Sequence, residues 1–200
     1  ESAQTTHFSV VDASGMAVSN TYTLEASWGC KIVVRGGGFV LNNEMGDFNW
    51  VPGRTDSRGR IGTEPNTIEP RKRMLSSQAP TIVRQNGRVV LVTGSPGGRT
   101  IINTVISILV SHLEYGLPLD QAVRGPRLHH QWLPDTLSFE GLRHADYQQA
   151  VAELKIAGHQ LNRRYPQGSA HSIAIDEDGT AWGVGDWRRS GFAAGVASDE

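Results

Sequence analysis

The chain has 200 residues, and its 19 basic and 20 acidic residues leave a formal net charge of −1. This length suits one domain with a substantial core. The balance of charge gives no reason to expect nucleic acid or an anionic membrane as a general partner. The single cysteine, Cys30, excludes an internal disulfide. The apolar runs, such as 105–110, are far shorter than the ~20 residues of a membrane-spanning helix, so we expect no membrane span in this chain.

Two further features concern the surface and the chain start. The cationic clusters at 71–73, 163–164 and 188–189 are short, and we interpret each as solvated surface. The sequence opens with Glu1 rather than Met, which indicates a fragment or a processed product.

The first part of the chain predicts a hairpin and then a long loop. Phe8, Val10 and their neighbours indicate a strand, and a turn at 12–15 leads into a second strand over 16–24. The segment 46–70 is rich in Gly, Pro, Arg, Asn and Thr and has little periodicity, which predicts a loop. Loops of this length in compact domains are usually functional or disordered.

The remainder predicts a layered α/β arrangement. A second hairpin pairs 81–83 with 89–93 around an Asn-Gly turn. Helices are expected over 100–115, closed by Gly116, over 119–123, and over 145–157, stopped by Gly158. The chain then returns to strands at 172–175 and 180–184. Strands, then helices, then strands are typical of a layered fold.

Thr5 precedes the first strand and has two interpretations. A threonine near a chain start is usually an ordinary strand residue. A threonine that becomes an N-terminus, however, carries both a nucleophilic hydroxyl and an α-amine whose ordinary pKa lies near neutrality. One residue then combines the nucleophile and base that Ser–His enzymes assemble from two.

Gly97 and Gly98 lie between a predicted strand and a predicted helix. Paired glycines at a helix start allow two N–H groups to point at an oxygen, as in an oxyanion hole. A phosphate loop would need a Gly-Lys-Ser/Thr ending, which is missing. A tight turn that simply requires glycine remains equally compatible with these two residues.

Two polar groups have open roles on local grounds. Ser76 and Ser77 offer adjacent hydroxyls for a substrate carboxylate, although loop serines more often cap local backbone. Glu44 and Asp47, three residues apart, suit an ammonium, a metal or acid–base chemistry, or a solvated surface. We expect no metal and no cofactor, because no histidine lies near these acids in sequence and the adjacent pair His129-His130 would point to opposite strand faces.

Six segments in order resemble the small subunit of the γ-glutamyltranspeptidases. They are TTHFSVVD at 5–12, YTL at 22–24, LNNEMGDF at 41–48, LSS at 75–77, TGSPGGR at 93–99 and PRLHHQWLPD at 126–135. The resemblance implies an α/β (α+β) fold, the αββα sandwich of the N-terminal-nucleophile hydrolases, completed by a large subunit not in this chain. It also implies autocatalytic cleavage at Gln4–Thr5. Residues 1–4 would then end the large-subunit side, and residues 5–200 would form a single-domain catalytic small subunit.

The resemblance also assigns roles to individual residues. Thr5 would form an acyl-enzyme with the γ-carbonyl, Thr23 would orient it, and the N–H groups of Gly97 and Gly98 would stabilise the oxyanion. The substrate's α-ammonium would contact Glu44 and Asp47, and its α-carboxylate would contact Ser76 and Ser77.

Two positions depart from the family pattern. Glu25 stands where well-known members carry Asn. Its carboxylate could still accept from the substrate ammonium, although it would repel a nearby carboxylate, and we expect Glu25 among the substrate-binding residues. The 46–70 segment, in the place of the family's lid, lacks the tyrosine that often locks the site, and Arg58 falls near that place.

The implied function is a γ-glutamyl hydrolase and transpeptidase acting on glutathione-like compounds. Its partners would be the large subunit of the same precursor and a γ-glutamyl small molecule such as glutathione, and its expected location is periplasmic or secreted. The alternatives are a cephalosporin (glutaryl) acylase or a poly-γ-glutamate depolymerase of the same fold, and a non-catalytic homologue.

Overall fold

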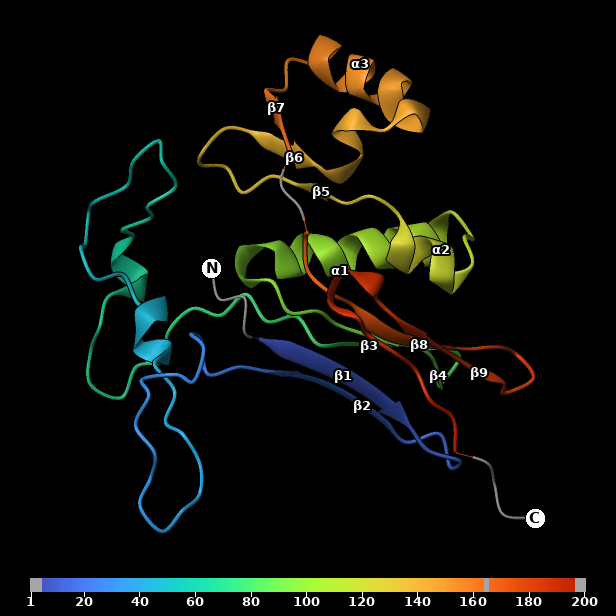
Figure 1. Ribbon diagram of the computed structural model, residues 1–200, viewed down its shortest axis with the longest axis horizontal. Coiled ribbons are helices and arrows are strands. Elements are labelled where there is room, and N and C mark those ends of the chain that lie inside the picture. Colours follow the sequence, from blue (N-terminus) through green and yellow to red (C-terminus); the bar gives the residue numbers. More distant parts are fainter. Residues whose placement is uncertain (1–4, 164–165, 197–200) are drawn as a thin grey trace.

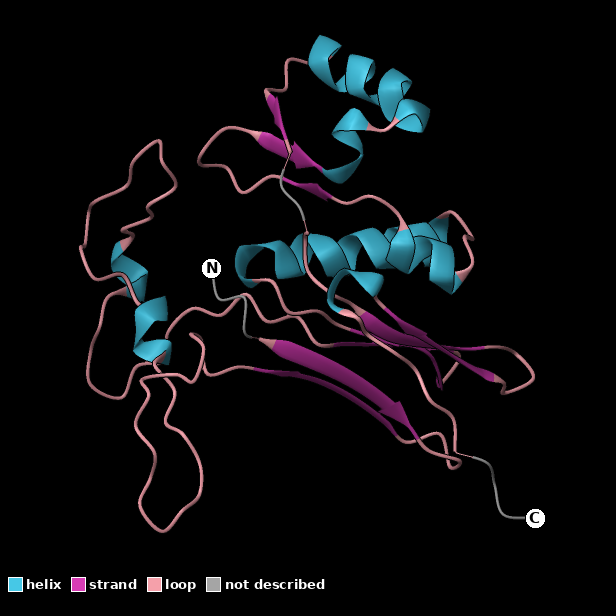
Figure 2. Ribbon diagram, in the orientation of Figure 1, coloured by secondary structure: helices cyan, strands magenta, loops and turns pink. Residues whose placement is uncertain are grey.

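The computed structural model describes residues 5–163 and 166–196. Figures 1 and 2 show two helices above a sheet, and a hairpin below that sheet. The sheet contains β3 (Thr81–Gln85), β4 (Arg88–Thr93), β8 (His171–Ile175) and β9 (Ala181–Gly185), in the order β3-β4-β8-β9. All three pairings are antiparallel. The predicted second hairpin and the two C-terminal strands are thus confirmed.

The helices α1 (Ile101–Leu109) and α2 (Leu119–Arg124) cover one face of this sheet. Their apolar sides form the core with β4, β8 and the segment before β8; its buried members are Leu91, Ile108, Leu119, Ala122, Val123, Ala170 and Ala174. The helix predicted over 100–115 begins as a 3₁₀ turn and ends in a π-helical turn, Val110–Glu114, before Gly116. The core therefore lies on the helical side of the sheet.

The hairpin β1 (Thr6–Val11) and β2 (Ala17–Tyr22) packs against the other face of the sheet. The hairpin turns polar side chains toward the sheet, whereas a hairpin usually turns apolar ones inward. The inward side chains are those of His7, Ser9, Ser19 and Thr21. Ser9 Oγ donates to the carbonyl of His171 at 2.8 Å, and Ser19 Oγ donates to the carbonyl of Thr93 at 2.9 Å. The outward face instead exposes apolar side chains, namely Phe8, Val10, Val18 and Tyr22.

A smaller unit lies beyond the helices. It contains β5 (Leu128–His129), β6 (Leu137–Phe139), β7 (Leu161–Asn162) and α3 (Gln148–Ile156), with β5 antiparallel and β7 parallel to β6. The helix predicted over 145–157 is thus divided into a 3₁₀ turn and α3, and Gly158 ends it at φ +92°. The 3₁₀ helices are Glu44–Asp47, Glu64–Asn66, Gly98–Thr100, Glu140–Arg143, Ala145–Tyr147 and Trp187–Arg189.

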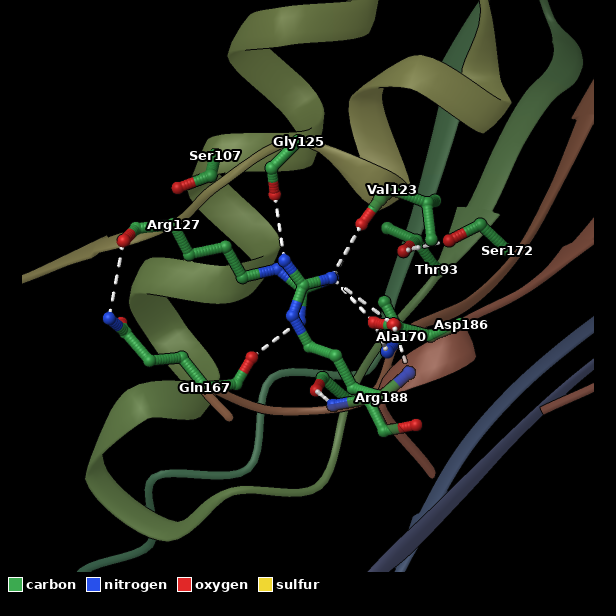
Figure 3. A network of polar contacts seen from close by, with 12 residues as sticks. Thr93, Ser107, Val123, Gly125, Arg127, Gln167, Ala170, Ser172, Asp186 and Arg188 are labelled. Carbon is green, nitrogen blue, oxygen red and sulfur yellow. Dashed lines mark hydrogen bonds and ion pairs between the residues drawn. The ribbon is translucent and has the colours of Figure 1, made fainter. Parts of the chain in front are cut away.

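The prediction that residues 188–189 form solvated surface is wrong for Arg188, whose side chain is 1% exposed (Figure 3). It pairs with Glu140 and with Asp186 Oδ1 at 3.2 Å. Arg127, also buried, donates from Nη2 to Asp186 Oδ2 at 2.6 Å. Two arginines and two carboxylates neutralise one another, which is why these charges lie inside. The clusters at 71–73 and at Arg163 lie at the surface, while Arg164 is outside the described residues.

Candidate active site

Thr5 and Thr23 face each other at the open end of the first hairpin. The register pairs Thr6 with Tyr22 and His7 with Thr21, which places Thr5 opposite Thr23. The Thr5 hydroxyl donates to the Thr23 hydroxyl at 3.1 Å. Because strand side chains alternate, a change of one residue in the 12–15 turn would send Thr23 to the other face. The length of the predicted turn thus decides whether Thr5 and Thr23, 18 residues apart in sequence, can contact each other.

The pocket at this end has a volume of about 220 Å³. It brings together eight of the nine predicted site residues. Its lining consists of Thr5, Thr23, Glu25, Glu44, Asp47, Ser76, Ser77, Gln78, Gly98, Arg99 and Ile101. Thr5 is 6% exposed, so its hydroxyl lies in a sheltered position. A larger groove of about 740 Å³ between α2 and β9 contains none of the predicted residues.

Three carboxylates line the acidic part of this pocket. Burial raises the pKa of Glu44, and the charges of Asp47 and Glu25 raise it further. Burial also raises the pKa of Asp47. The 3₁₀ geometry aligns these two side chains, since residues i and i+3 eclipse each other. A cation would relieve the repulsion that Asp47 and Glu25 exert on Glu44 and would compensate the burial of the two acids, so this cluster is suited to an ammonium group.

Two contacts fix the acidic cluster beside the threonines. The main-chain N–H of Glu25 donates to Thr23 Oγ1 at 2.8 Å, and Asn43 Nδ2 donates to Glu25 Oε2. Glu25 adopts φ +68°, a conformation that is uncommon outside glycine. In the described part of the chain, Glu44 Oε1 is buried with no hydrogen-bond partner. A buried acceptor of this kind is costly unless a ligand satisfies it.

The serines come from a different part of the chain than the acids. Ser77 Oγ donates to the carbonyl of Gly98 at 2.9 Å, and Ser76 Oγ accepts from the N–H of Gln78 at 3.2 Å. Ser76 thus makes the local backbone contact that the ordinary interpretation expects, whereas the Ser77 contact joins segments 21 residues apart. Both also line the pocket, where the Ser76 O–H is available to donate to a carboxylate, whereas Ser77 would first have to turn its O–H away from the Gly98 carbonyl.

The glycine pair lies between β4 and α1, as predicted. Gly97 has φ +136°, and a Cβ there would lie 2.5 Å from Thr100 Oγ1, so this position requires glycine. Gly98 lines the pocket, whereas Gly97 is buried directly before it and is not part of the lining. The pair meets the requirement for a tight turn, and its role as an oxyanion hole remains a prediction.

His7, two residues after Thr5, is buried between the β1-β2 hairpin and the four-stranded sheet. Its ring contacts Thr21 Oγ1 at 2.9 Å and Ser9 Oγ at 3.1 Å. Burial, together with the nearby His171, lowers the pKa of His7 to about 4. His7 is therefore neutral near pH 7, and it aligns the strands without adding charge.

The predicted loop over 46–70 contains one further short 3₁₀ turn, Glu64–Asn66. Beyond Asp47, which lines the pocket itself, the loop contacts Arg99 of the pocket lining. Arg99 Nη1 donates to the carbonyl of Gly59 at 2.9 Å. Arg58, expected near the latch, does not line the pocket; its N–H donates to Asp56. The contact between loop and site thus involves a residue that our sequence reasoning missed, although Arg99 directly follows the glycine pair.

Other functional candidates differ in how visible they were in the sequence. Gln78 follows Ser76-Ser77, so adjacency to a predicted motif could have found it. Arg189 Nη1 donates to the carbonyl of Thr5 at 3.3 Å, and no local signal indicated this. His129 is buried and its ring contacts Asn103 Oδ1 at 2.9 Å, so it packs and hydrogen-bonds in the interior. Among the described residues, no helix is long and apolar enough to cross a membrane.

Comparison with known proteins identifies the family. The model of the γ-glutamyltranspeptidase family matches residues 1–196 of this chain. The chain belongs to the γ-glutamyltranspeptidase family. It is 44% identical over 188 residues to the glutathione hydrolase proenzyme of Escherichia coli, covering 94% of this chain and 32% of that protein. The corresponding proenzyme of Pseudomonas aeruginosa is 46% identical over 179 residues, covering 88% and 32%.

A solved structure of this family also matches. The γ-glutamyltranspeptidase of Pseudomonas nitroreducens, complexed with L-DON, is 41% identical with a TM-score of 0.84, covering 96% of this chain and 100% of that chain. The chain therefore has the fold of the N-terminal-nucleophile hydrolases, as the sequence predicted. It spans about a third (32%) of the length of the curated relatives that it matches. This share is consistent with one subunit of a longer precursor.

Proposed function

We propose that this chain is the catalytic small subunit of a γ-glutamyl hydrolase and transpeptidase that cleaves glutathione-like compounds. The observation that carries the proposal is the pocket in which Thr5, Thr23 and three carboxylates meet. The proposal includes autocatalytic cleavage at Gln4–Thr5, which frees the Thr5 α-amine. Gln4 is outside the described residues.

The reaction would proceed through an ester on Thr5. The Thr5 hydroxyl attacks the γ-carbonyl carbon while the α-amine takes the hydroxyl proton. N–H groups of Gly97 and Gly98 hold the resulting oxyanion, and loss of one such donor typically costs about 10²–10³ in rate. The C–N bond then breaks, and the leaving amine takes the proton back. Water or an acceptor amine attacks the ester and its proton passes to the α-amine. The bond between the acyl carbon and Thr5 Oγ then breaks, and Thr5 Oγ takes that proton as the glutamyl group leaves.

The charges in the pocket support a free glutamyl head group as the substrate. Glu25, Glu44 and Asp47 would surround the α-ammonium, because a nearby cation favours the ionised forms of Glu44 and Asp47, whose pKa values are raised by burial in the pocket. Ser76 would donate to the α-carboxylate, and Ser77 would do so by turning its O–H from the Gly98 carbonyl to the substrate. A glutaryl group has the same length but no ammonium, so it would leave three acids uncompensated. This favours γ-glutamyl compounds over the glutaryl compounds of a cephalosporin acylase.

The outward face of the first hairpin supports a large partner subunit. Phe8, Val10, Val18 and Tyr22 are each 43–57% exposed on one face of two paired strands. A sandwich of the αββα type places a layer over this face, and the described residues supply only one helical layer. We propose that the other subunit of the same precursor covers it. A periplasmic or secreted location is part of the same proposal and rests on family resemblance.

The test starts from the full precursor, expressed as wild type and as Thr5→Ala. Intact mass should show a small chain that begins at Thr5 in the wild type and an uncut precursor in the variant. The mature protein should release glutamate from glutathione and show no turnover of glutaryl-cephalosporin. Turnover of the glutaryl compound alone would make it an acylase. An uncut wild-type chain would indicate a non-catalytic homologue.

A further inference from the structure

We propose that Arg189 is a positioning residue that anchors the Thr5 main chain and keeps the freed Thr5 α-amine unprotonated. This inference rests on the proposed function, because it concerns the amine that cleavage at Gln4–Thr5 would release. Arg189 was expected to be solvated surface, and it is indeed partly exposed. Its guanidinium nevertheless reaches the nucleophile residue, since Nη1 donates to the Thr5 carbonyl at 3.3 Å.

The turn that carries Arg189 is held rigidly. Residues Trp187–Arg189 form a 3₁₀ turn, and Asp186 Oδ1 caps it by accepting from the N–H of Arg188 at 3.0 Å. Arg188 itself is buried beside Asp186 (Figure 3) and also pairs with Glu140. Because the network fixes the backbone of this turn, the Arg189 side chain starts close to Thr5. It therefore loses less conformational entropy when it forms the contact.

Covalent geometry brings the charge close to the amine. Within one residue, bond lengths limit the separation of the main-chain N and O to about 3.6 Å. Added to the 3.3 Å contact, this places Arg189 Nη1 no more than about 7 Å from the Thr5 nitrogen. A positive charge at this range disfavours a second positive charge. The base form of the amine is therefore favoured.

The surrounding charges explain why such a cation matters. Glu25, Glu44 and Asp47 line the same pocket as Thr5 and would stabilise a protonated amine as readily as a substrate ammonium. Arg189 opposes this effect from the main-chain side of Thr5, and Arg99 adds a positive charge to the pocket lining.

Three other groups act on Arg189 or lie near Thr5. Asp186 and His171 interact electrostatically with Arg189. Burial lowers the pKa of His171 and brings that of His7 to about 4, so both rings are neutral near pH 7. Arg189 is thus a cation whose guanidinium contacts the Thr5 main chain.

The experiment compares Arg189→Gln and Arg189→Met, which remove the charge, with Arg189→Lys, which retains it. Arg88→Gln is the matched control, because Arg88 is exposed and its Nη1 also donates to a main-chain carbonyl, that of Glu177, at 2.9 Å. The first readout is the pH profile of kcat/KM for γ-glutamyl-p-nitroanilide, which reports the free enzyme. The second is competitive labelling of the Thr5 α-amine across pH, quantified on the N-terminal peptide by mass spectrometry.

We expect the two charge-removing variants to move the acid limb of both profiles up by about half a pH unit or more. The lysine variant and the Arg88 control should keep the wild-type limb. A lower kcat with an unmoved limb would show a purely structural role and overturn the inference. A shift of the acid limb in the lysine variant equal to that in the charge-removing variants would also overturn the inference.

The two readouts separate this inference from the proposed function. A labelling shift without any γ-glutamyl turnover would support the role of Arg189 and refute the proposed activity. γ-Glutamyl turnover with unshifted profiles would support the proposed activity and refute the role of Arg189. A chain in which Thr5 never gains a free amine would overturn both.

Discussion

Replacing Thr23 by Val isolates the contribution of one hydroxyl to the nucleophile. Valine has nearly the shape of threonine but can neither donate nor accept a hydrogen bond. The substitution removes the acceptor for the Thr5 hydroxyl at 3.1 Å and for the Glu25 N–H at 2.8 Å. The side-chain packing should change little. The freed Glu25 N–H, which helps to fix the acidic cluster, would affect KM, so the change in kcat reports orientation of the nucleophile.

The expected loss follows from these two contacts. A neutral hydrogen bond contributes about 0.5–1.5 kcal/mol net, so the loss of two amounts to about 1–3 kcal/mol. At about 1.4 kcal/mol per tenfold change, this corresponds to a rate of acylation lower by about 5- to 150-fold. Most of the effect should be in kcat, because the Thr5 hydroxyl reacts rather than binds.

The assay is single-turnover release of p-nitroaniline from γ-glutamyl-p-nitroanilide, using protein whose maturation has been verified by intact mass. Thr23→Ser retains the hydroxyl and serves as the control, with a rate expected within about threefold of wild type because only a methyl group is lost. If fully matured Thr23→Val acylates within twofold of wild type, the contact between the two threonines does not orient the nucleophile and this reasoning is refuted.

Two further substitutions test the acidic cluster and the buried ion network. Glu44→Gln removes a charge from the proposed ammonium site, so KM for the donor should rise by about 10- to 100-fold while a glutaryl donor gains relative to it; an unchanged KM in steady-state assays would place the ammonium elsewhere. Asp186→Asn leaves Arg127 and Arg188 with one carboxylate, and should lower the free energy of unfolding by about 3–5 kcal/mol in denaturant titrations. Burial opposes ionisation of Asp186, yet the Arg127 charge holds its pKa below the ordinary value. Its stabilising contribution is therefore present above the unfolded-state pKa and is lost as pH falls through the lower folded-state value. The variant should lack this acid-dependent loss, and parallel pH–stability curves for both proteins would contradict the assignment.

The local parts of the site could be predicted from sequence, because short-range geometry decides them. The turn at 12–15 sets the register of the hairpin, and this register places Thr5 opposite Thr23. The spacing of Glu44 and Asp47 aligns their carboxylates on one 3₁₀ turn. The position of Gly97 between a strand and a helix requires a backbone conformation that glycine readily adopts.

Only the tertiary structure decided which of these pieces meet and which charges are buried. Ser77 reaches the acids because it contacts Gly98, 21 residues further along the chain. Arg188 lies in the interior because Glu140, 48 residues away, neutralises it, whereas its neighbour Arg189 extends to Thr5 across 184 residues. Long-range electrostatic pairing leaves no periodicity or motif in the sequence. Such contacts therefore emerge only when the strands and turns are assembled.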